Sequence, residues 1–303
     1  MIKKLIAVLC VFGLLAAGYA GAESAMLIKA PGGAPALAVA ALGTAEPDCL
    51  QTVGADAIAA EFGKEEADFI IAPVNAGAKL FKAGKSTYRL AAVVTWGNLV
   101  FASQAEGFTP ESMNGKKVTL FGENTINASV ALYVMEQKGI APAETEYLAT
   151  AAATQTLLTS DAEAIVLTAE PAATAATMKN DKITIIPLND LLKEITGDEG
   201  FAQAGLFVRE KTIQEKPEEV KEWLEKIRAS ADQCAENVES TAANAVALEI
   251  LANEKVAQIA IPKCGIRYVA AAEAREQIEK TANIDLSQYG GAVPADEFYF
   301  EAE

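Results

Sequence analysis

Two stretches of nine residues in this chain follow the same plan. Residues 67–75 read ADFIIAPVN and residues 162–170 read AEAIVLTAE. Each has a carboxylate near its start and then an apolar run, and each stops at a polar residue, Asn75 or Glu170, where a helical pattern begins. A short apolar run with such boundaries is typical of a strand buried on both faces in a helix-covered parallel sheet. The repetition therefore predicts an α/β protein built from two similar lobes.

Strand and helix patterns alternate through most of the chain, which is the order that produces parallel sheets covered by helices. A charged stretch with glycine and proline, residues 104–117, separates the first set of patterns from the second. The last third is mainly helical and begins with a long charged pattern at residues 215–238. The length also favours two lobes, because one compact core rarely takes so many residues. We expect four parts: a leader at 1–22, the first part of lobe I at 23–103, lobe II at 104–205, and the return to lobe I with the C-terminal helices at 206–303.

The first 22 residues have the pattern of an export signal. Two lysines precede an apolar run at residues 5–17, and small residues follow at 20–22. The run is shorter than the roughly 20 residues that span a bilayer, and a leader of this kind is removed from the mature protein. Cys10 lies inside the apolar run rather than after it, so the leader has no lipobox. We expect cleavage near Ala22 and a periplasmic or secreted protein.

Composition excludes several classes of function. The formal net charge is −16, so the chain repels nucleic acid and anionic lipid surfaces, and no nucleic-acid partner is expected. The chain has no histidine, which removes Ser-His-Asp and Cys-His catalysis and zinc sites built on imidazole. It also has no glycine motif of the phosphate-binding or dinucleotide-binding kind. We expect no catalytic residue, no metal ligand and no cofactor.

Three cysteines follow the leader: Cys49, Cys234 and Cys264. Their spacing leaves two alternatives open, because pairing cannot be deduced from sequence. One is a bridge such as Cys234–Cys264 with one free thiol, and the other is three buried thiols.

The ends of the expected strands place the candidate ligand loops. In open α/β sheets a ligand lies beyond the carboxyl ends of the strands, where helix N-termini present free N–H groups. Each loop also has a purely structural reading, because glycine permits tight turns, Asn and Thr cap helices, and tryptophan can belong to the core. The Trp96 ring can instead cover a flat or cationic part of a ligand. The candidates from this rule are residues 31–34 with Gly32 and Gly33, Asn75, residues 96–98 with Trp96, residues 122–125 with Glu123, Asn124 and Thr125, and residues 168–170 with Thr168 and Glu170.

Several segments resemble a known family in their order and spacing. They read AMLIKAPGGAPALAVAAL, ADFIIAPVNAGAKLF, ESMNGKKVTLFGEN and AEAIVLTAEPAATAAT, and the tail includes AIPKCGIRYV and LSQYGGAVPADEFYF. The family is that of the extracytoplasmic solute-binding proteins of ABC importers, of the nitrate/sulfonate/thiamine-precursor type. The resemblance covers nearly the whole chain after the leader.

The resemblance implies a type II periplasmic-binding fold. In that fold two α/β lobes with parallel-rich sheets are joined by two crossovers, close over one small ligand in the cleft between them, and dock on a membrane permease. The implied function is to capture a small organic solute and deliver it to the ABC permease without any reaction, and we expect a monomer. The family's ligand loops fall on the candidate loops above and add Pro73 and Thr95 to them.

The charge of the solute follows from the loops themselves. They contain two carboxylates, Glu123 and Glu170, and lack arginine and lysine apart from Lys29 before Gly32. Together with Trp96, they favour a neutral or cationic solute that contains a ring. Bare helix N-termini also hold anions, so an anionic solute stays open. Two other functions stay open as well: a dehydratase-like enzyme on the same fold, and a sensor that binds a ligand without transport.

Overall fold

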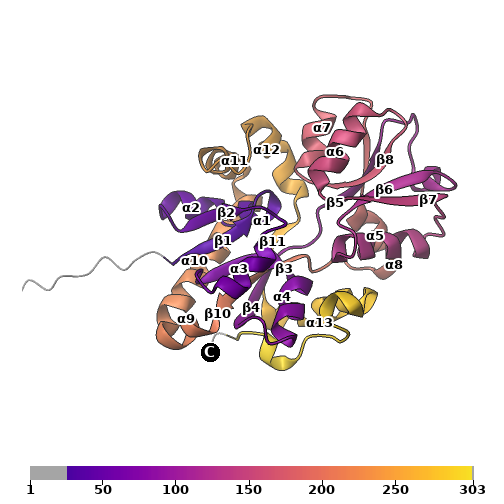
Figure 1. Cartoon of the computed structure of the whole chain (residues 1–303). Coiled ribbons are helices and arrows are strands. Elements are labelled where there is room, and N and C mark those ends of the chain that lie inside the picture. Colours follow the sequence, from indigo (N-terminus) through magenta and orange to yellow (C-terminus); the bar gives the residue numbers. More distant parts are fainter. Residues whose placement is uncertain (1–25, 302–303) are drawn as a thin grey trace, which may run out of the picture.

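The computed structural model describes residues 26–301 of the chain. These residues form two groups of elements, each built around one sheet, and the chain crosses twice between the groups (Figure 1). The two-lobed α/β prediction is therefore confirmed. The predicted export signal at residues 1–22 lies outside the described residues. Within residues 26–301, none of the helices has the length and apolar character needed to span a bilayer.

The sheet of lobe I has six strands in the order β11-β4-β10-β3-β1-β2. They are β1 (Ile28–Pro31), β2 (Leu50–Val53), β3 (Phe69–Pro73), β4 (Tyr88–Thr95), β10 (Ala204–Arg209) and β11 (Ile266–Ala270). β1 lies parallel to both of its neighbours and pairs Ile28 with Leu50 on one side and with Phe69 on the other. β10 is antiparallel to β3 and β4, and β11 is antiparallel to β4.

The sheet of lobe II has five strands in the order β7-β6-β8-β5-β9. They are β5 (Leu99–Ser103), β6 (Lys117–Phe121), β7 (Glu144–Leu148), β8 (Ile165–Ala169) and β9 (Thr184–Pro187). β6 is parallel to β7 and β8. β5 is antiparallel to β8 and β9, and it pairs Leu99 with Ala169.

The two crossings explain why both sheets are mixed. β4 leads through residues 96–98 into β5, and the chain returns through residues 197–203 into β10. A strand that enters from the other lobe starts where its neighbours end, so β5 and β10 run antiparallel to both of their neighbours. The other strands, apart from β11, share one direction within each sheet, so the sheets are parallel-rich as expected and mixed through these reversed strands. The expected end of the first part of lobe I at residue 103 is corrected, because β5 pairs within the second sheet.

Helices pack on both faces of the lobe I sheet, and alternate strand residues therefore enter two different cores. In β3, Ile70 joins a core cluster with Phe62, whereas Phe69 and Ile71 join a cluster with Trp223. This alternation is the period of a strand that is covered on both sides.

The helices of lobe I are α1 (Ala34–Leu37), α2 (Ala40–Ala45), α3 (Ile58–Lys64), α4 (Val74–Lys82), α9 (Glu210–Glu215), α10 (Pro217–Glu236), α11 (Val238–Ala247), α12 (Glu254–Ala260) and α13 (Ala271–Ile284), and those of lobe II are α5 (Ile126–Gln137), α6 (Ala151–Ser160), α7 (Ala172–Thr177) and α8 (Leu188–Thr196). Four short 3₁₀ turns complete the description: η1 (Pro110–Met113), η2 (Ile261–Lys263), η3 (Leu286–Tyr289) and η4 (Asp296–Phe298).

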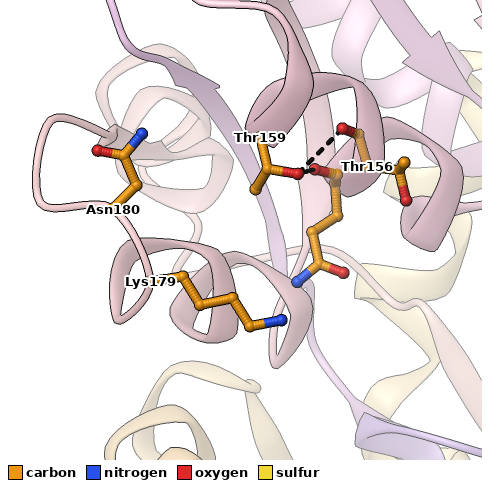
Figure 2. Close-up of a pocket in the computed structure, with 5 residues that line it drawn as sticks. Thr156, Thr159, Lys179 and Asn180 are labelled. Carbon is orange, nitrogen blue, oxygen red and sulfur yellow. Dashed lines mark hydrogen bonds between the residues drawn. The ribbon is translucent and has the colours of Figure 1, made fainter.

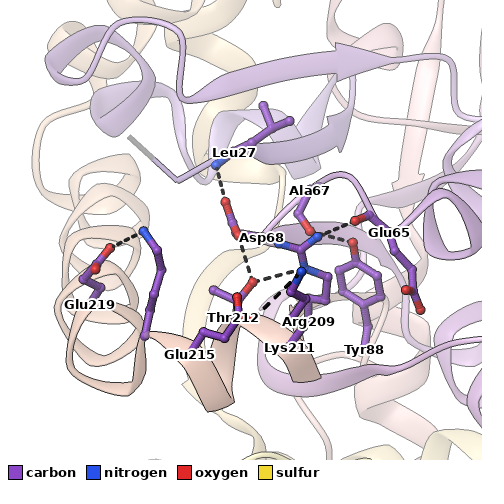
Figure 3. A network of polar contacts seen from close by, with 11 residues as sticks. Leu27, Glu65, Ala67, Asp68, Tyr88, Arg209, Lys211, Thr212, Glu215 and Glu219 are labelled. Carbon is purple, nitrogen blue, oxygen red and sulfur yellow. Dashed lines mark hydrogen bonds and ion pairs between the residues drawn. The ribbon is translucent and has the colours of Figure 1, made fainter. Parts of the chain in front are cut away.

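A polar network at the far end of lobe I fixes the ends of three strands (Figure 3). The Asp68 carboxylate accepts hydrogen bonds from the Leu27 N–H at 3.0 Å and from Thr212 Oγ1 at 2.8 Å. Arg209 Nη2 forms an ion pair with the same carboxylate at 3.0 Å. Because these residues lie beside β1, β3 and β10, the carboxylate that opens the first repeated stretch has a structural role far from the crossings.

Candidate functional site

The turn between β1 and α1 contains the first candidate pair, Gly32 and Gly33. Gly33 has a φ of 89° and a ψ of −147°, a conformation that L residues other than glycine rarely adopt. A methyl group in place of its hydrogen would lie 3.9 Å from Pro171 Cδ. Pro171 precedes α7 of lobe II, so this turn brings the two lobes into close approach.

Asn75 follows β3 and lies in the first turn of α4, two residues after Pro73. The N-cap residue of α4 is Pro73, which makes no side-chain cap. The Asn75 side chain is only 8% exposed, and its Oδ1 has no hydrogen-bond partner among the described residues. Helix capping, the structural alternative for Asn75, therefore does not account for this buried amide.

Thr95 and Trp96 end β4 and begin the first crossing. Thr95 Oγ1 accepts a hydrogen bond from the Ala204 N–H at 3.0 Å, which joins the two crossing strands. Trp96 Nε1 donates to the carbonyl of Arg267 at 2.9 Å, and the Arg267 guanidinium lies 4.7 Å from the centre of the indole ring. Both candidate side chains are buried. In this arrangement one face of the indole is thus covered by Arg267.

The loop from β6 to α5 holds Glu123, Asn124 and Thr125. Glu123 and Asn124 are exposed, and Asn124 has a φ of 58°. Thr125 is the N-cap of α5: its Oγ1 accepts from the Ala128 N–H at 3.5 Å and donates to the Gly122 carbonyl at 2.6 Å. The capping expected of Thr125 is present, and the exposed pair before it is free to face a ligand.

Thr168 and Glu170 end the second repeated stretch. Thr168 Oγ1 donates to the Ala151 carbonyl at 3.1 Å and is fully buried. Glu170 is only 2% exposed, and its carboxylate caps α7 by accepting from the Thr174 N–H at 2.9 Å and from Thr174 Oγ1 at 3.0 Å. Both oxygens of Glu170 are thus bound within lobe II.

Lys29, the one basic residue beside the candidate loops, is also engaged. Its Nζ forms ion pairs with Glu61 at 2.6 Å and with Glu66 at 2.8 Å. Lys29 and Glu61 are both about 4% exposed. Desolvation works against the charge on Lys29, but the hydrogen bonds that its ammonium donates to these carboxylates outweigh it and raise the pKa of the ammonium. This lysine is therefore a structural ion-pair partner inside lobe I.

Two further residues at the junction of the lobes have a buried polar atom: Asn98, in the candidate turn at residues 96–98, and Gln203, which the sequence did not indicate. Asn98 and Gln203 each have a buried side-chain oxygen without a partner among the described residues, as Asn75 does. Gln203 lies on the second crossing, where its carbonyl accepts from the Val74 N–H at 3.0 Å and its Nε2 donates to Asn127 Oδ1 at 3.1 Å. Asn98 belongs to the candidate turn at residues 96–98, which its place after a strand had indicated. Nothing in the local sequence around Gln203 marks it.

Three further contacts lie at the junction of the lobes. Lys263 Nζ donates to Thr174 Oγ1 at 3.3 Å, and Ser129 Oγ donates to Asp285 Oδ2 at 2.7 Å. Lys280 forms an ion pair with Asp198 at 3.2 Å. Besides these, α12 contacts α7, and α13 contacts α5 as well as β4 (Figure 1). The lobes therefore meet on both sides of the crossings.

Surface hollows occur elsewhere on the molecule. Figure 2 shows a polar hollow of about 390 Å³ on lobe II between α6 and the end of α7, lined by residues that include Thr156, Thr159, Lys179 and Asn180. A second, of about 500 Å³, lies beside α10 and β11, and a third, of about 310 Å³, lies between α5, α8 and α13. None of the residues that line these three hollows belongs to the predicted ligand loops.

The acidic side chains and the cysteines of the described residues bear on metal binding and on disulfide formation. Over residues 26–301, no group of three or more His, Cys, Asp or Glu side chains is arranged to hold a metal ion. Cys49, Cys234 and Cys264 are free and buried, so of the two alternatives the structure has the three buried thiols.

Comparisons with known proteins agree with this architecture. A family model described as NMT1/THI5 like matches residues 54–240. The fold is similar to that of an ABC transporter from Parabacteroides distasonis, with a TM-score of 0.76 and 21% identity over 93% of this chain and 100% of that one. It is also similar to the periplasmic aliphatic sulphonate binding protein SsuA from Escherichia coli, with a TM-score of 0.68 and 13% identity over 92% of each chain. A ligand-binding component of an ABC-type import system from Staphylococcus aureus, with zinc bound, gives a TM-score of 0.68 and 11% identity over 91% of this chain and 96% of that one. The comparison with curated proteins found no match. The type II periplasmic-binding fold is thereby confirmed.

Proposed function

The chain belongs to the NMT1/THI5-like family, and from that membership we propose that it captures a small organic solute outside the cytoplasmic membrane and delivers it to the permease of an ABC importer. Solved structures of similar fold include periplasmic and import-system binding proteins. The two-lobed architecture suits capture, because a solute held between lobes can be enclosed and later released by one movement.

The close approach of Gly33 to Pro171 is the observation that supports this role most directly. The two residues belong to loops that sequence reasoning placed at the ligand site from separate lobes, and they come together here. The two hydrogen bonds between Glu170 and Asn98 lend further support, because they hold Glu170, another predicted residue, beside the first crossing. The support for this role is thus that the loops after β1 and after β8 meet at the junction of the lobes.

Capture by enclosure is differential binding. A solute that touches both lobes only when they are together shifts the equilibrium toward the closed arrangement. A shift from mostly open to mostly closed takes about 5.5 kcal/mol of differential affinity. Several hydrogen bonds in a desolvated cleft supply a free energy of this size, and no covalent bond is made or broken.

The solute we propose is neutral or cationic and contains a ring. Support comes from the buried oxygens of Asn75 and Asn98, which have no donors among the described residues, so a solute that brings N–H or O–H groups would complete them. Further support comes from Lys29, whose charge is already neutralised by Glu61 and Glu66. Glu123 is the exposed candidate carboxylate for a cationic group, because the oxygens of Glu170 are bound to Thr174.

The setting of the capture step is part of the proposal. We place the protein in the periplasm or in the medium, with the leader at 1–22 removed, and we propose that it acts as a monomer. Of the residues predicted for the site, those proposed to contact the solute are Gly32, Gly33, Pro73, Asn75, Thr95, Trp96, Glu123, Asn124, Thr125, Thr168 and Glu170.

Native mass spectrometry of the purified protein, followed by release of bound small molecules, tests this function. We expect one bound solute per chain, and titration of the stripped protein with that solute should saturate at 1:1 and raise its thermal stability. The solute should be recovered unchanged. Conversion of the solute would identify an enzyme instead, and failure to detect saturable binding of any co-purified molecule would contradict capture.

A further inference from the structure

A lysine of lobe I holds a buried carboxylate group of lobe II through one threonine. Lys263 Nζ donates to Thr174 Oγ1 at 3.3 Å, and the same hydroxyl donates to Glu170 Oε1 at 3.0 Å. Lys263 ends η2, which joins α12 to β11 of the lobe I sheet, whereas Thr174 lies in α7 of lobe II. The series of hydrogen bonds from Lys263 through Thr174 to Glu170 therefore connects the two lobes.

The charges at the two ends of this chain are complementary and otherwise unmatched. Glu170 is 2% exposed, and within lobe II its oxygens accept only neutral N–H and O–H groups, both from Thr174. Lys263 forms no ion pair with a carboxylate of residues 26–301. A buried carboxylate is stabilised by a cation brought near it, and this cation comes from the opposite lobe.

The neighbouring thiol lies within the electrostatic influence of the same carboxylate. Cys264 directly follows Lys263, and its pKa is raised first by burial and next by the negative charge of Glu170. The carboxylate therefore lies close to the η2 segment as well as to α7. Pro171, the next residue, approaches Gly33 of lobe I, so the lysine contact lies beside the point where the candidate ligand loops meet.

We propose that Lys263 is a closure residue: its ammonium, carried by lobe I, holds the Glu170–Thr174 pair of lobe II and biases the protein toward the arrangement in which the lobes enclose the solute. This inference rests on the proposed capture function. Lys263 affects solute binding by favouring the closed position of the lobes, and it makes no contact with the solute. The contact exists only while the lobes are together, so it stabilises the closed state and not the open state.

Distance measurements without solute test the proposal. Nitroxide labels at Met178→Cys on lobe II and Ala243→Cys on lobe I report the distance between the lobes by electron–electron double resonance. These sites are suitable because both native residues are exposed. The native thiols are buried, and their raised pKa values keep them from reacting with the label. We expect the ratio of closed to open protein to fall about threefold in Lys263→Met, the size typical of one exposed charge contact, and to recover in Lys263→Arg.

Two controls separate a specific contact from a general charge effect. Lys255→Met removes an exposed lysine of α12 that has no ion pair with a described residue, and we expect no change in the closed fraction. In a Glu170→Gln background, Lys263→Met should have less effect than in the parent, because the charge partner is gone. Identical distance distributions for the parent and Lys263→Met would overturn the proposal, as would an equal shift in Lys255→Met.

Solute titration distinguishes a failure of this proposal from a failure of the capture function. If the capture function is correct, Lys263→Met weakens solute affinity by the same factor by which it lowers the closed fraction, and Lys263→Arg restores both. Unchanged distances together with tight solute binding would reject the closure residue and leave capture intact. Changed distances with no solute binding would reject capture and leave the contact between the lobes intact.

Discussion

Asn98 and Glu170 are joined by two hydrogen bonds although 72 positions separate them in the chain. The Glu170 N–H donates to the Asn98 carbonyl at 2.8 Å, and Asn98 Nδ2 donates to the Glu170 carbonyl at 2.7 Å. Asn98 ends the first crossing and Glu170 follows β8. The pair therefore attaches the end of the second repeated stretch to the segment that links the lobes.

Replacing Asn98 by alanine should destabilise the protein by about 1–3 kcal/mol, because the buried Glu170 carbonyl loses its side-chain donor. Denaturant unfolding measures this change. The matched control is Asn283→Ala, which removes an exposed amide bonded only to the Glu279 carbonyl and should change stability by less than about 0.5 kcal/mol. Equal effects of the two variants would show that the Asn98 contact does not stabilise the fold.

Gly33→Ala should cost about 1–3 kcal/mol of stability, because its φ of 89° and ψ of −147° suit glycine and strain other residues. The space around the new methyl is adequate, since its nearest neighbour is Pro171 Cδ at 3.9 Å. Gly32→Ala is the control: its added methyl would meet nothing within 4 Å and its φ lies outside the left-handed region. Thermal unfolding of the two variants should rank them in that order, and the reverse order would refute the strain at Gly33.

Glu61→Gln should destabilise the protein by about 2 kcal/mol at neutral pH, the size of a hydrogen bond to a charged group. The hydrogen bond from Lys29, followed by that from Lys64, lowers the pKa of Glu61 below 4.5. A lowered folded-state pKa stabilises the protein above the unfolded value, and this contribution is lost as the pH falls through the folded value.

The difference in unfolding free energy between the parent and Glu61→Gln should accordingly shrink as the pH drops below 4.5. Glu163→Gln, at an exposed carboxylate without an ion pair among the described residues, serves as the control and should show no such trend. A constant difference for Glu61→Gln from neutral to acid pH would exclude the ion pair as its cause.

The thiols should be unreactive in the folded protein. Burial raises the pKa of Cys49 to about 11 and that of Cys234 to about 12, and it raises the pKa of Cys264 as well. Only the thiolate reacts with disulfide reagents. An aromatic disulfide reagent that releases a coloured thiolate should therefore label none of the three thiols of the native protein at pH 8 and all three in denaturant. Rapid labelling of the folded protein would contradict the burial of the thiols.

Local sequence patterns were sufficient for the strands that lead to the site. The apolar runs of β3 and β8 and the polar residues that follow them could be predicted because strand formation and burial depend on neighbours in the chain. The same reasoning predicted the long helix at 215–238, found as α10 at Pro217–Glu236. It missed β11, because a five-residue edge strand that pairs only with β4 has little pattern of its own.

The role of each candidate side chain was beyond such reasoning. Glu170 was predicted from its place after a strand, but its oxygens are taken up by Thr174, and its backbone is bound by Asn98. Trp96 was predicted as a ring for a ligand, but Arg267, which comes from β11, covers one of its faces. Partners such as these are brought near by the folding of distant segments.

The order of residues was enough to establish two α/β lobes, the loops at the strand ends and the absence of histidine chemistry, because secondary-structure periodicity and composition are local properties of a chain. Folding in three dimensions settled which way β5 and β10 run, how Lys29 is neutralised and which lysine faces Glu170. The physical reason is that hydrogen bonds and ion pairs are selected by distance in space. Lys263 and Thr174 are 89 positions apart, and no pattern along the chain records their contact.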